Sequence, residues 1–115
     1  MAETRCGITG LPLAAAAAVL TATMAFPQAA TAEPKDADAL KRFVHQDCGS
    51  CHGLLLKGGL GPELTQGALQ YYDRDVLALV ILDGIGDTPM PPWRPLLSEK
   101  DAARIANYLL SGEMK

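Results

Sequence analysis

The sequence predicts an all-α fold with three main helices, and three observations support this prediction. Apolar residues recur at the i, i+3, i+4 spacing of one helical face in three separate segments. Residues that favour helix ends flank two of these segments. We find no convincing strand, and a length of 115 residues is enough for one folded domain only.

The first helix is expected from about Asp36 to Cys48. Leu40, Phe43 and Val44 lie on one face of this segment at helical spacing. A short helical turn is also expected near residues 66–71. The segment between these two elements, residues 53–62, is rich in glycine, and we expect its backbone to pack close to the edge of a bound ligand.

The second helix is expected from about Arg74 to Asp83. Asp73 is its expected N-cap, because an aspartate side chain can accept hydrogen bonds from the first free backbone N–H groups. Gly84 is expected to end the helix. The expected buried stripe comprises Val76, Leu77, Val80 and Ile81.

The third helix is expected from Glu99 to Ser111. Ser98 is its expected cap, and Asp101 follows three residues later, where a complete capping box carries Glu or Gln. Gly112 is expected to end this helix. Its expected inward face comprises Ala102, Ile105, Ala106 and Leu109.

The composition excludes several classes of protein. The net charge of −3 argues against a nucleic-acid-binding protein, which needs a basic face to neutralise phosphates. With 20% charged and 5% aromatic residues, the chain matches neither a coiled coil nor an acidic disordered segment. The apolar residues are also unevenly distributed, and they are densest in the first 32 positions.

Residues 1–32 have the pattern of an export signal. Arg5 gives a weakly positive start, an uncharged Ala-rich run follows, and Ala30-Thr31-Ala32 supplies the small residues of a cleavage site. The run is shorter than the roughly 20 residues that span a bilayer, and an uncleaved anchor is the alternative. We therefore expect cleavage after Ala32, which leaves residues 33–115 as the exported domain and removes Cys6.

The two cysteines of the exported domain belong to a haem-attachment motif. Cys48 and Cys51 are separated by two small residues, and His52 follows at once. On a helical turn, two thiols at this spacing can each bond one vinyl group on the same porphyrin edge, and the next imidazole can reach the iron. The sequence therefore predicts one haem c, attached covalently through Cys48 and Cys51, with His52 as an axial ligand.

Three other interpretations of the two cysteines fit less well. A thioredoxin-like redox pair needs a βαβ context, and no strand pattern precedes Cys48. A zinc site would have to use Cys48, Cys51, His45 and His52 within eight residues, which is too crowded for a closed tetrahedron. A disulfide across two intervening residues would be strained and would close almost no loop.

Met90 is the expected sixth ligand of the iron. It stands 38 residues after His52, in the segment Thr88-Pro89-Met90-Pro91-Pro92-Trp93, where prolines restrict the backbone and suit a weak thioether ligand. His45 lies too near the cysteines to reach the opposite face, and Met114 lies in a tail that we expect to fray. Two alternatives are a methionine that fills a core gap and a polyproline peptide for an aromatic groove.

These motifs resemble those of the class I c-type cytochromes over nearly the whole exported domain. Residues 53–62 and 87–93 resemble more narrowly the cytochrome c55X group, which is associated with the haem-d-containing nitrite reductase of denitrifying bacteria. The resemblance implies a small class I cytochrome c fold with three main helices around one covalently bound haem. The matching stretches are Cys48-Gly49-Ser50-Cys51-His52-Gly53, Gly61-Pro62-Glu63-Leu64, Gly84, Met90-Pro91-Pro92-Trp93, Leu97-Ser98 and Ala106-Asn107-Tyr108-Leu109.

The resemblance also implies two structural details. In the family, a carbonyl at the Gly-Pro step accepts the hydrogen bond of the proximal imidazole, so the Pro62 backbone is expected to orient His52. The first and last helices cross in that fold, which would bring Phe43 near Tyr108.

The expected function is that of a periplasmic one-electron carrier and not of an enzyme. Two protein ligands leave the iron no open position, and no catalytic acid, base or nucleophile is grouped near the motif. The resemblance implies that the chain delivers electrons to nitrite reductase or takes part in maturing its haem d. Ligand sensing or catalysis at a displaceable sixth position is the alternative, and a relay subunit fixed in a larger dehydrogenase is a third.

The expected partners are redox proteins. The negative charge favours a partner with a basic docking patch, so association should slow as salt rises. We expect a monomer without a stable membrane span after cleavage, and no interaction with nucleic acid.

Overall fold

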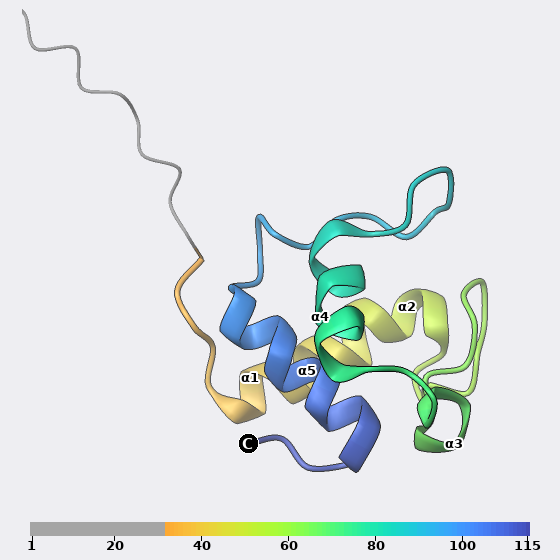
Figure 1. Ribbon diagram of the computed structural model, residues 1–115, viewed down its shortest axis with the longest axis horizontal. Helices are drawn as coiled ribbons and strands as arrows, with labels where there is room; N and C mark the ends of the chain where they lie inside the picture. Colours follow the sequence, from red (N-terminus) through yellow and green to blue (C-terminus); the bar gives the residue numbers. More distant parts are fainter. Residues whose placement is uncertain (1–31) are drawn as a thin grey trace, which may run out of the picture.

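The helices of the domain are arranged around α5, the last helix (Figure 1). The computed structural model describes residues 32–115, and the predicted signal peptide, residues 1–32, lies outside the described residues except for Ala32. The described part of the chain is helical with no strand, as the all-α prediction requires. In chain order the elements are α1 (Ala37–Phe43), the π-helical η1 (Val44–Cys48), α2 (Gly49–His52), α3 (Gln66–Leu69), α4 (Arg74–Asp83) and α5 (Glu99–Ser111).

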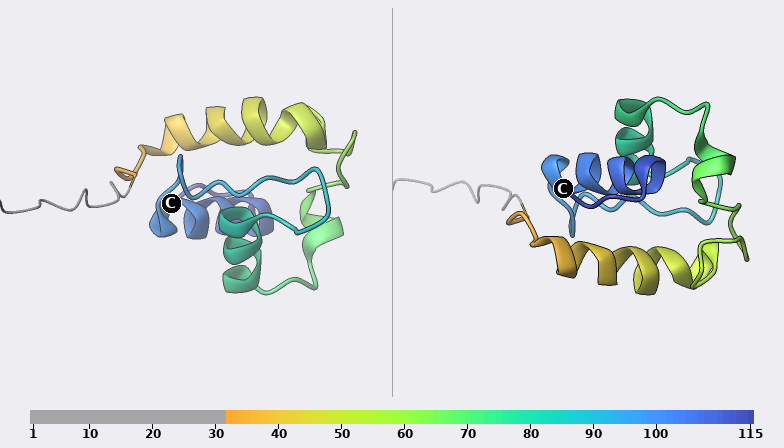
Figure 2. Two further views of the ribbon diagram at one scale, coloured as in Figure 1. Left: turned by 90° about the horizontal axis from the view of Figure 1, so that it is seen from above. Right: turned by 90° about the horizontal axis from the view of Figure 1, so that it is seen from below.

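α1 begins where the sequence predicts and buries the predicted face. Asp36 is its N-cap, and its carboxylate accepts a hydrogen bond from the Ala39 N–H at 2.7 Å. Leu40 and Val44 are fully buried, and Phe43 is half-buried against the core. This face crosses α5, so the first and last helices pack together (Figure 2).

η1 and α2 carry the first helical run to His52, beyond the predicted end at Cys48. The π turn is closed by a hydrogen bond from the Gly49 N–H to the Val44 carbonyl. Gly49 and Ser50 have low intrinsic helix propensity, which is why the sequence alone suggests an earlier end. Local contacts override this preference, since Gly49 is buried and the Ser50 hydroxyl donates a hydrogen bond to the Asp47 carbonyl at 2.6 Å.

α4 has the predicted ends, with Asp73 and Gly84 as its caps, but the predicted buried stripe is partly wrong. Val76 is 53% exposed and Val80 is only half-buried. Every residue from 76 to 82 is apolar, so periodicity cannot single out one face of this helix. The face that packs against α5 is formed by Leu77, Ala78, Ile81 and Leu82.

α5 has the predicted bounds and a complete capping box. The Ser98 hydroxyl accepts the Asp101 N–H at 3.1 Å, and the Ser98 N–H donates to the Asp101 carboxylate at 3.3 Å. The shorter aspartate therefore serves where Glu or Gln is usual. The predicted inward face is buried throughout, and it comprises Ala102, Ile105, Ala106 and Leu109.

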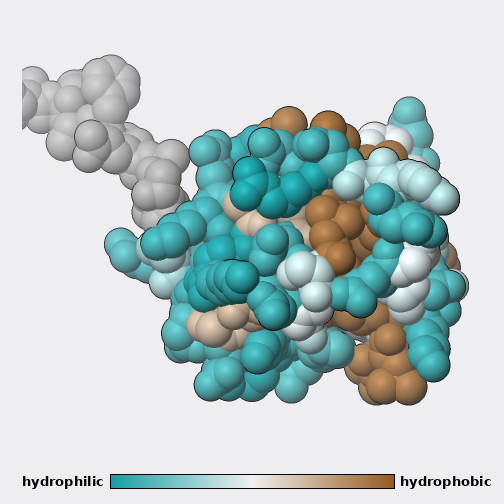
Figure 3. Space-filling view, turned by 60° about the horizontal axis from the view of Figure 1, so that its bottom comes forward, coloured by the Kyte–Doolittle hydropathy of each residue, from teal (hydrophilic) through white to brown (hydrophobic). Residues whose placement is uncertain are grey.

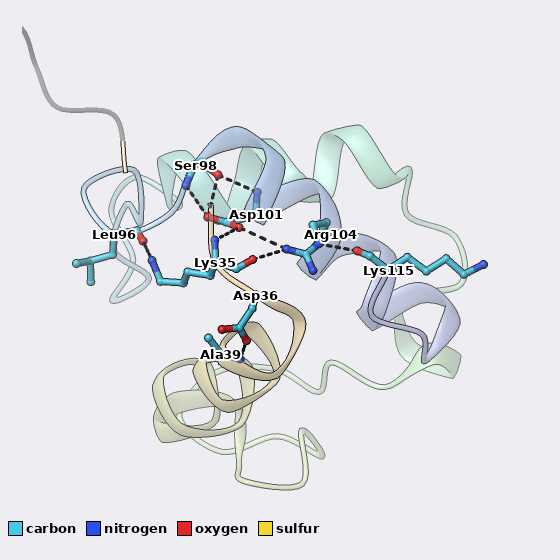
Figure 4. A network of polar contacts seen from close by, with 8 residues as sticks. All are labelled: Lys35, Asp36, Ala39, Leu96, Ser98, Asp101, Arg104 and Lys115. Carbon is cyan, nitrogen blue, oxygen red and sulfur yellow. Dashed lines mark hydrogen bonds and ion pairs between the residues drawn. The ribbon is translucent and has the colours of Figure 1, made fainter. Parts of the chain in front are cut away.

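The Asp101 carboxylate also anchors the segment before α1 (Figure 4). Asp101 is fully buried and accepts the Lys35 backbone N–H at 2.9 Å. The Arg104 guanidinium donates to the Lys35 carbonyl at 2.5 Å, and the Lys35 ammonium group donates to the Leu96 carbonyl at 2.5 Å. Because these partners come from three segments, the network fixes the start of the domain onto α5.

The C-terminal tail is folded back onto the domain, contrary to the expectation that it frays. Gly112 adopts the left-handed conformation that ends α5, and its N–H bonds to the Tyr108 carbonyl. The Asn107 side chain donates to the Glu113 carbonyl at 3.1 Å. Met114 is partly buried against the core.

The aromatic contacts differ in one respect from the expected crossing. Phe43 packs edge-on against Trp93, with ring centroids 5.1 Å apart. Tyr108 instead contacts His45, with centroids 6.2 Å apart.

Across residues 32–115, no helix has both the length and the apolar character needed to cross a bilayer.

Candidate haem site

Cys48 and Cys51 lie on the last turns of the first helical run. Both are half-buried, and neither forms a disulfide. Burial raises the pKa of the Cys48 thiol to about 11, and the nearby Asp47 carboxylate adds to this rise. At neutral pH the sulfur of Cys48 is therefore uncharged. This environment suits a thioether and disfavours the thiolate that a nucleophile or a zinc ligand requires.

His52 is buried and held by one short hydrogen bond. Its side chain is 9% exposed, and its Nδ1 lies 2.7 Å from the Pro62 carbonyl oxygen. Because a carbonyl only accepts, Nδ1 must carry the proton, and the lone pair of neutral imidazole lies on Nε2. The residues thus present a metal-binding nitrogen whose orientation is set by the Pro62 backbone.

A tight backbone loop, residues 58–62, backs the His52 ring, and we call it the collar. A Cβ at Gly61 would lie 2.7 Å from His52 Cε1, and one at Gly59 would lie 2.7 Å from the Cys51 carbonyl oxygen. The Gly61 N–H donates to the Cys51 carbonyl, and the Gly58 N–H donates to the His52 carbonyl, both at 2.8 Å. Glycine is needed at Gly59 and Gly61 because no side chain fits between the collar and the motif, and at Gly58 because its φ is 98°.

Met90 lies in a second loop, residues 84–93, which we call the Met90 loop. The Ile85 N–H donates to the Met90 carbonyl at 3.3 Å, and the Thr88 hydroxyl accepts the Met90 N–H at 3.3 Å. Gly84 has a φ of 68°, and a Cβ there would lie 2.7 Å from the Met90 carbonyl oxygen. These contacts give the backbone at Met90 a defined course, and its side chain is half-buried.

The Met90 loop and the segment after His52 extend toward the same end of the molecule (Figures 1 and 2). The base of the Met90 loop is closed by hydrogen bonds from the Trp93 and Arg94 N–H groups to the Leu82 carbonyl, at 3.0 and 3.2 Å. Trp93 points inward, where it packs on Phe43. Pro89, Pro91 and Pro92 are exposed, so the position of Trp93 does not test the polyproline interpretation.

His45 takes part in a different contact, which no pattern in the sequence indicates. One ring nitrogen, Nδ1, lies 3.1 Å from the Leu54 carbonyl oxygen, and the other, Nε2, lies 3.0 Å from the Tyr108 hydroxyl. His45 therefore links the first helical run to α5 through Nε2 and to the segment after His52 through Nδ1. Within residues 32–115, no group of three or more His, Cys, Asp or Glu side chains could hold a metal ion, which leaves the zinc interpretation without support.

Large apolar side chains are exposed on the segment after His52 and on the Met90 loop. Leu54, Leu55 and Leu60 follow His52 and are exposed, and Ile85 in the Met90 loop is exposed too. Figure 3 shows apolar side chains in a hollow of one face and at its edge. A small domain rarely leaves so many large apolar groups in water unless they cover a ligand or partner. The further exposed apolar residues are Tyr71, Tyr72, Val76, Leu79 and Leu96.

Comparisons with known proteins agree with this site. Residues 24–109 match the family model described as cytochrome C oxidase, cbb3-type, subunit III. Cytochrome c55X of Paracoccus denitrificans is 55% identical over 73% of this chain and 84% of its own length. Cytochrome c55X of Stutzerimonas stutzeri is 43% identical over 84% of this chain and 87% of its own length.

Two solved structures show the same fold. The c-type cytochrome NirC is 49% identical, with a TM-score of 0.65, over 67% of this chain and 91% of that chain. A domain of dihydro-heme d1 dehydrogenase NirN, solved in complex with DHE, is 30% identical with a TM-score of 0.58. The match covers 69% of this chain but only 16% of NirN, so NirN carries a domain of this kind within a longer chain.

The matched family carries haem c covalently on a Cys-x-x-Cys-His motif, and Cys48 and Cys51 stand at that motif here. The cofactor is therefore haem c, and the function is electron transfer and not catalysis. The chain belongs to the class I c-type cytochrome family, and within that family it resembles the cytochromes c55X.

Proposed function

We propose that the chain is a periplasmic one-electron carrier of the nitrite reductase system, with its haem iron held between His52 and Met90. The observation that carries the proposal is the setting of His52. Its Nδ1 is engaged by the Pro62 carbonyl at 2.7 Å, and its ring lies against Gly61. Only Nε2 is left to bind a metal. A bound haem supplies a one-electron iron couple at this position.

Met90 is proposed as the second axial ligand. It is the one methionine of the Met90 loop, and that loop extends to the same end of the molecule as the segment after His52. Its backbone is fixed by Thr88, Ile85 and the flanking prolines, so little ordering remains to oppose a weak thioether bond. A haem iron bound by both His52 and Met90 would have no position left for a substrate, which suits a one-electron carrier.

Residues 1–32 are proposed to direct export, with cleavage after Ala32 and residues 33–115 as the mature domain. The Ala-rich run and the Ala30-Thr31-Ala32 sequence support this assignment. The anchoring of Lys35 by Asp101 is compatible with it, because Lys35 is the third residue of the proposed mature domain and would keep this contact after cleavage. Attachment of haem c through two thioethers also suits an exported protein.

The proposed partners are nitrite reductase and the proteins that mature its haem d. NirN, a dehydrogenase named for dihydro-haem d1, carries a domain similar to this chain. A separate small carrier with this fold is suited to exchange electrons with such an enzyme or with the reductase itself. The net charge of −3 supports docking on a basic patch, with association that slows as ionic strength rises.

The ligand assignment is tested by the optical spectrum of the ferric protein. We expect a six-coordinate low-spin spectrum with the weak far-red band of a sulfur–iron bond. Replacing Met90→Ala should abolish that band and give a high-spin form that binds carbon monoxide readily once reduced. Met114→Leu is the matched control and should change nothing. A wild-type protein that is already high-spin would instead favour the ligand-sensing alternative.

The partner assignment is tested by mixing the reduced protein with purified nitrite reductase in a stopped-flow instrument. We expect rapid oxidation of the haem c, with a second-order rate constant that falls as salt is added. Absence of electron transfer to the reductase would remove it as a partner. Electron exchange with a dihydro-haem d1 dehydrogenase would then point to haem maturation.

A further inference from the structure

We propose that Asp83 and Arg94 form a clamp that closes the base of the Met90 loop and positions Met90 toward the iron. The inference rests on the proposed ligation of the iron by Met90. Asp83 and Arg94 would act on it indirectly, as residues that position Met90. Asp83 is the last residue of α4, and Arg94 follows the Met90 loop directly. The two side chains therefore meet across the two ends of the loop.

Two hydrogen bonds join the side chains of Arg94 and Asp83. Arg94 Nε lies 2.5 Å from Asp83 Oδ1, and Arg94 Nη2 lies 3.3 Å from Asp83 Oδ2. A guanidinium paired with a carboxylate in this way fixes orientation as well as distance. Arg94 Nη1 also lies 3.5 Å from Glu99 at the start of α5. One arginine thus joins α4, the end of the loop and α5.

Backbone hydrogen bonds extend the clamp toward Met90. The Trp93 and Arg94 N–H groups bond to the Leu82 carbonyl, beside the ion pair. The next link is the hydrogen bond from Ile85 to the Met90 carbonyl. Met90 therefore lies on the returning arm of a narrow loop, and separating the two arms at the base would move it.

The loop depends on these links because it has little core packing of its own. Residues 85–89 and 91–92 are all exposed, and Met90 is the one half-buried residue among them. A segment with few buried contacts opens locally at low cost in free energy. Links at its base therefore decide how often the Met90 thioether leaves its position.

The ion pair is formed throughout the neutral range. The hydrogen bond from Arg94, together with its charge, lowers the pKa of Asp83 below its ordinary value of about 3.8. Both side chains are about half exposed, with exposed fractions of 53% and 46%, so salt should weaken the pair. An exposed pair contributes little to global stability, which separates an effect on the loop from an effect on the whole fold.

The test compares two exposed ion pairs in the haem-loaded protein. Asp83→Asn and Arg94→Gln break the clamp, whereas Asp75→Asn and Arg74→Gln break the Arg74–Asp75 pair at the start of α4, which is 2.7 Å long. The readout is the rate at which external imidazole replaces Met90 in the ferric protein, followed by loss of the far-red band. Urea unfolding of each variant reports the stability of the whole fold.

The clamp variants should exchange Met90 roughly two- to fivefold faster than wild type, the size expected for an exposed pair. The Arg74 and Asp75 variants should not change the rate, and all four should unfold at similar urea concentrations. Added salt should raise the wild-type rate but not that of Asp83→Asn. Arg94→Lys, which keeps the charge without the fork, should give an intermediate rate.

Two outcomes would overturn the clamp, and they are distinguishable. If the far-red band is present but the clamp variants match the Arg74 and Asp75 controls, Met90 ligation stands and the clamp is wrong. If wild-type protein shows no band and binds imidazole at once, the proposed Met90 ligation fails and the clamp fails with it.

Discussion

The two sides of the proposed haem site are built on different principles. On one side, His52 is buried, and the backbone of the collar packs against its ring. No charged residue takes part in this contact. On the other, Met90 lies in an exposed loop held by hydrogen bonds, prolines and the Asp83–Arg94 pair. Close packing fixes the His52 ring, whereas hydrogen bonds that close its loop hold Met90, the proposed thioether ligand.

The largest effect is expected from filling the space behind His52. Gly61→Ala places a methyl group 2.7 Å from His52 Cε1, so either the ring or the collar must move. We expect the yield of haem-loaded, low-spin protein to fall severalfold, measured by optical spectroscopy after purification.

Gly67→Ala is the matched control for that substitution, because nothing lies within 4 Å of the added carbon. It lies in a helix, so its free energy of unfolding should stay the same or rise by up to about 1 kcal/mol. If Gly61→Ala gave as much low-spin protein as Gly67→Ala, packing behind the ring would not fix His52.

A change remote from both ligands should lower the stability of the fold without altering the site. Asp101→Ala removes the carboxylate that completes the capping box with Ser98 and leaves the partly buried Lys35 N–H without its acceptor. We expect a loss of roughly 3 kcal/mol in the free energy of unfolding, measured by urea titration. Asp101→Asn keeps an acceptor and should lose less. A changed native spectrum in either variant would contradict the separation between this network and the haem site.

The smallest effect is expected from acid. Because the pKa of Asp83 is lowered in the folded protein, the clamp is fully present above the ordinary value of about 3.8 and is lost as pH falls through the folded value. With carbon monoxide, which does not protonate, as the incoming ligand of the reduced protein, the rate of Met90 replacement should therefore be flat from neutral pH to about 4 and rise below it. Asp83→Asn should lack this acid step, and a step that persists in that variant would assign it to another group.

Local signals explain which parts of the fold could be predicted from the sequence. α4 and α5 have the predicted bounds because Asp73 and Ser98 cap them through contacts within three residues. The haem-attachment motif is equally local. By contrast, the face that α4 buries depends on where α5 lies, and an all-apolar segment gives no periodic signal for it.

The sequence predicts the principal residues of the candidate site, but not the residues that hold them in place. Cys48, Cys51 and His52 form a contiguous motif, and the role of Pro62 followed from a family resemblance. The sequence does not indicate the ion pair of Arg94, because its partner Asp83 lies 11 residues away on another element. The contacts of His45 and the folding back of Met114 are also tertiary, so no pattern in the sequence could reveal them.

The central claim, that Met90 binds the iron opposite His52, is tested most directly by proton NMR of the reduced protein. When a methionine sulfur binds haem iron, its methyl group lies over the porphyrin ring, and the ring current shifts the methyl resonance far upfield of all others. We expect one such methyl resonance, which is retained in Met114→Leu and absent in Met90→Ala. A spectrum without that resonance, or one in which it survives Met90→Ala, would contradict ligation by Met90.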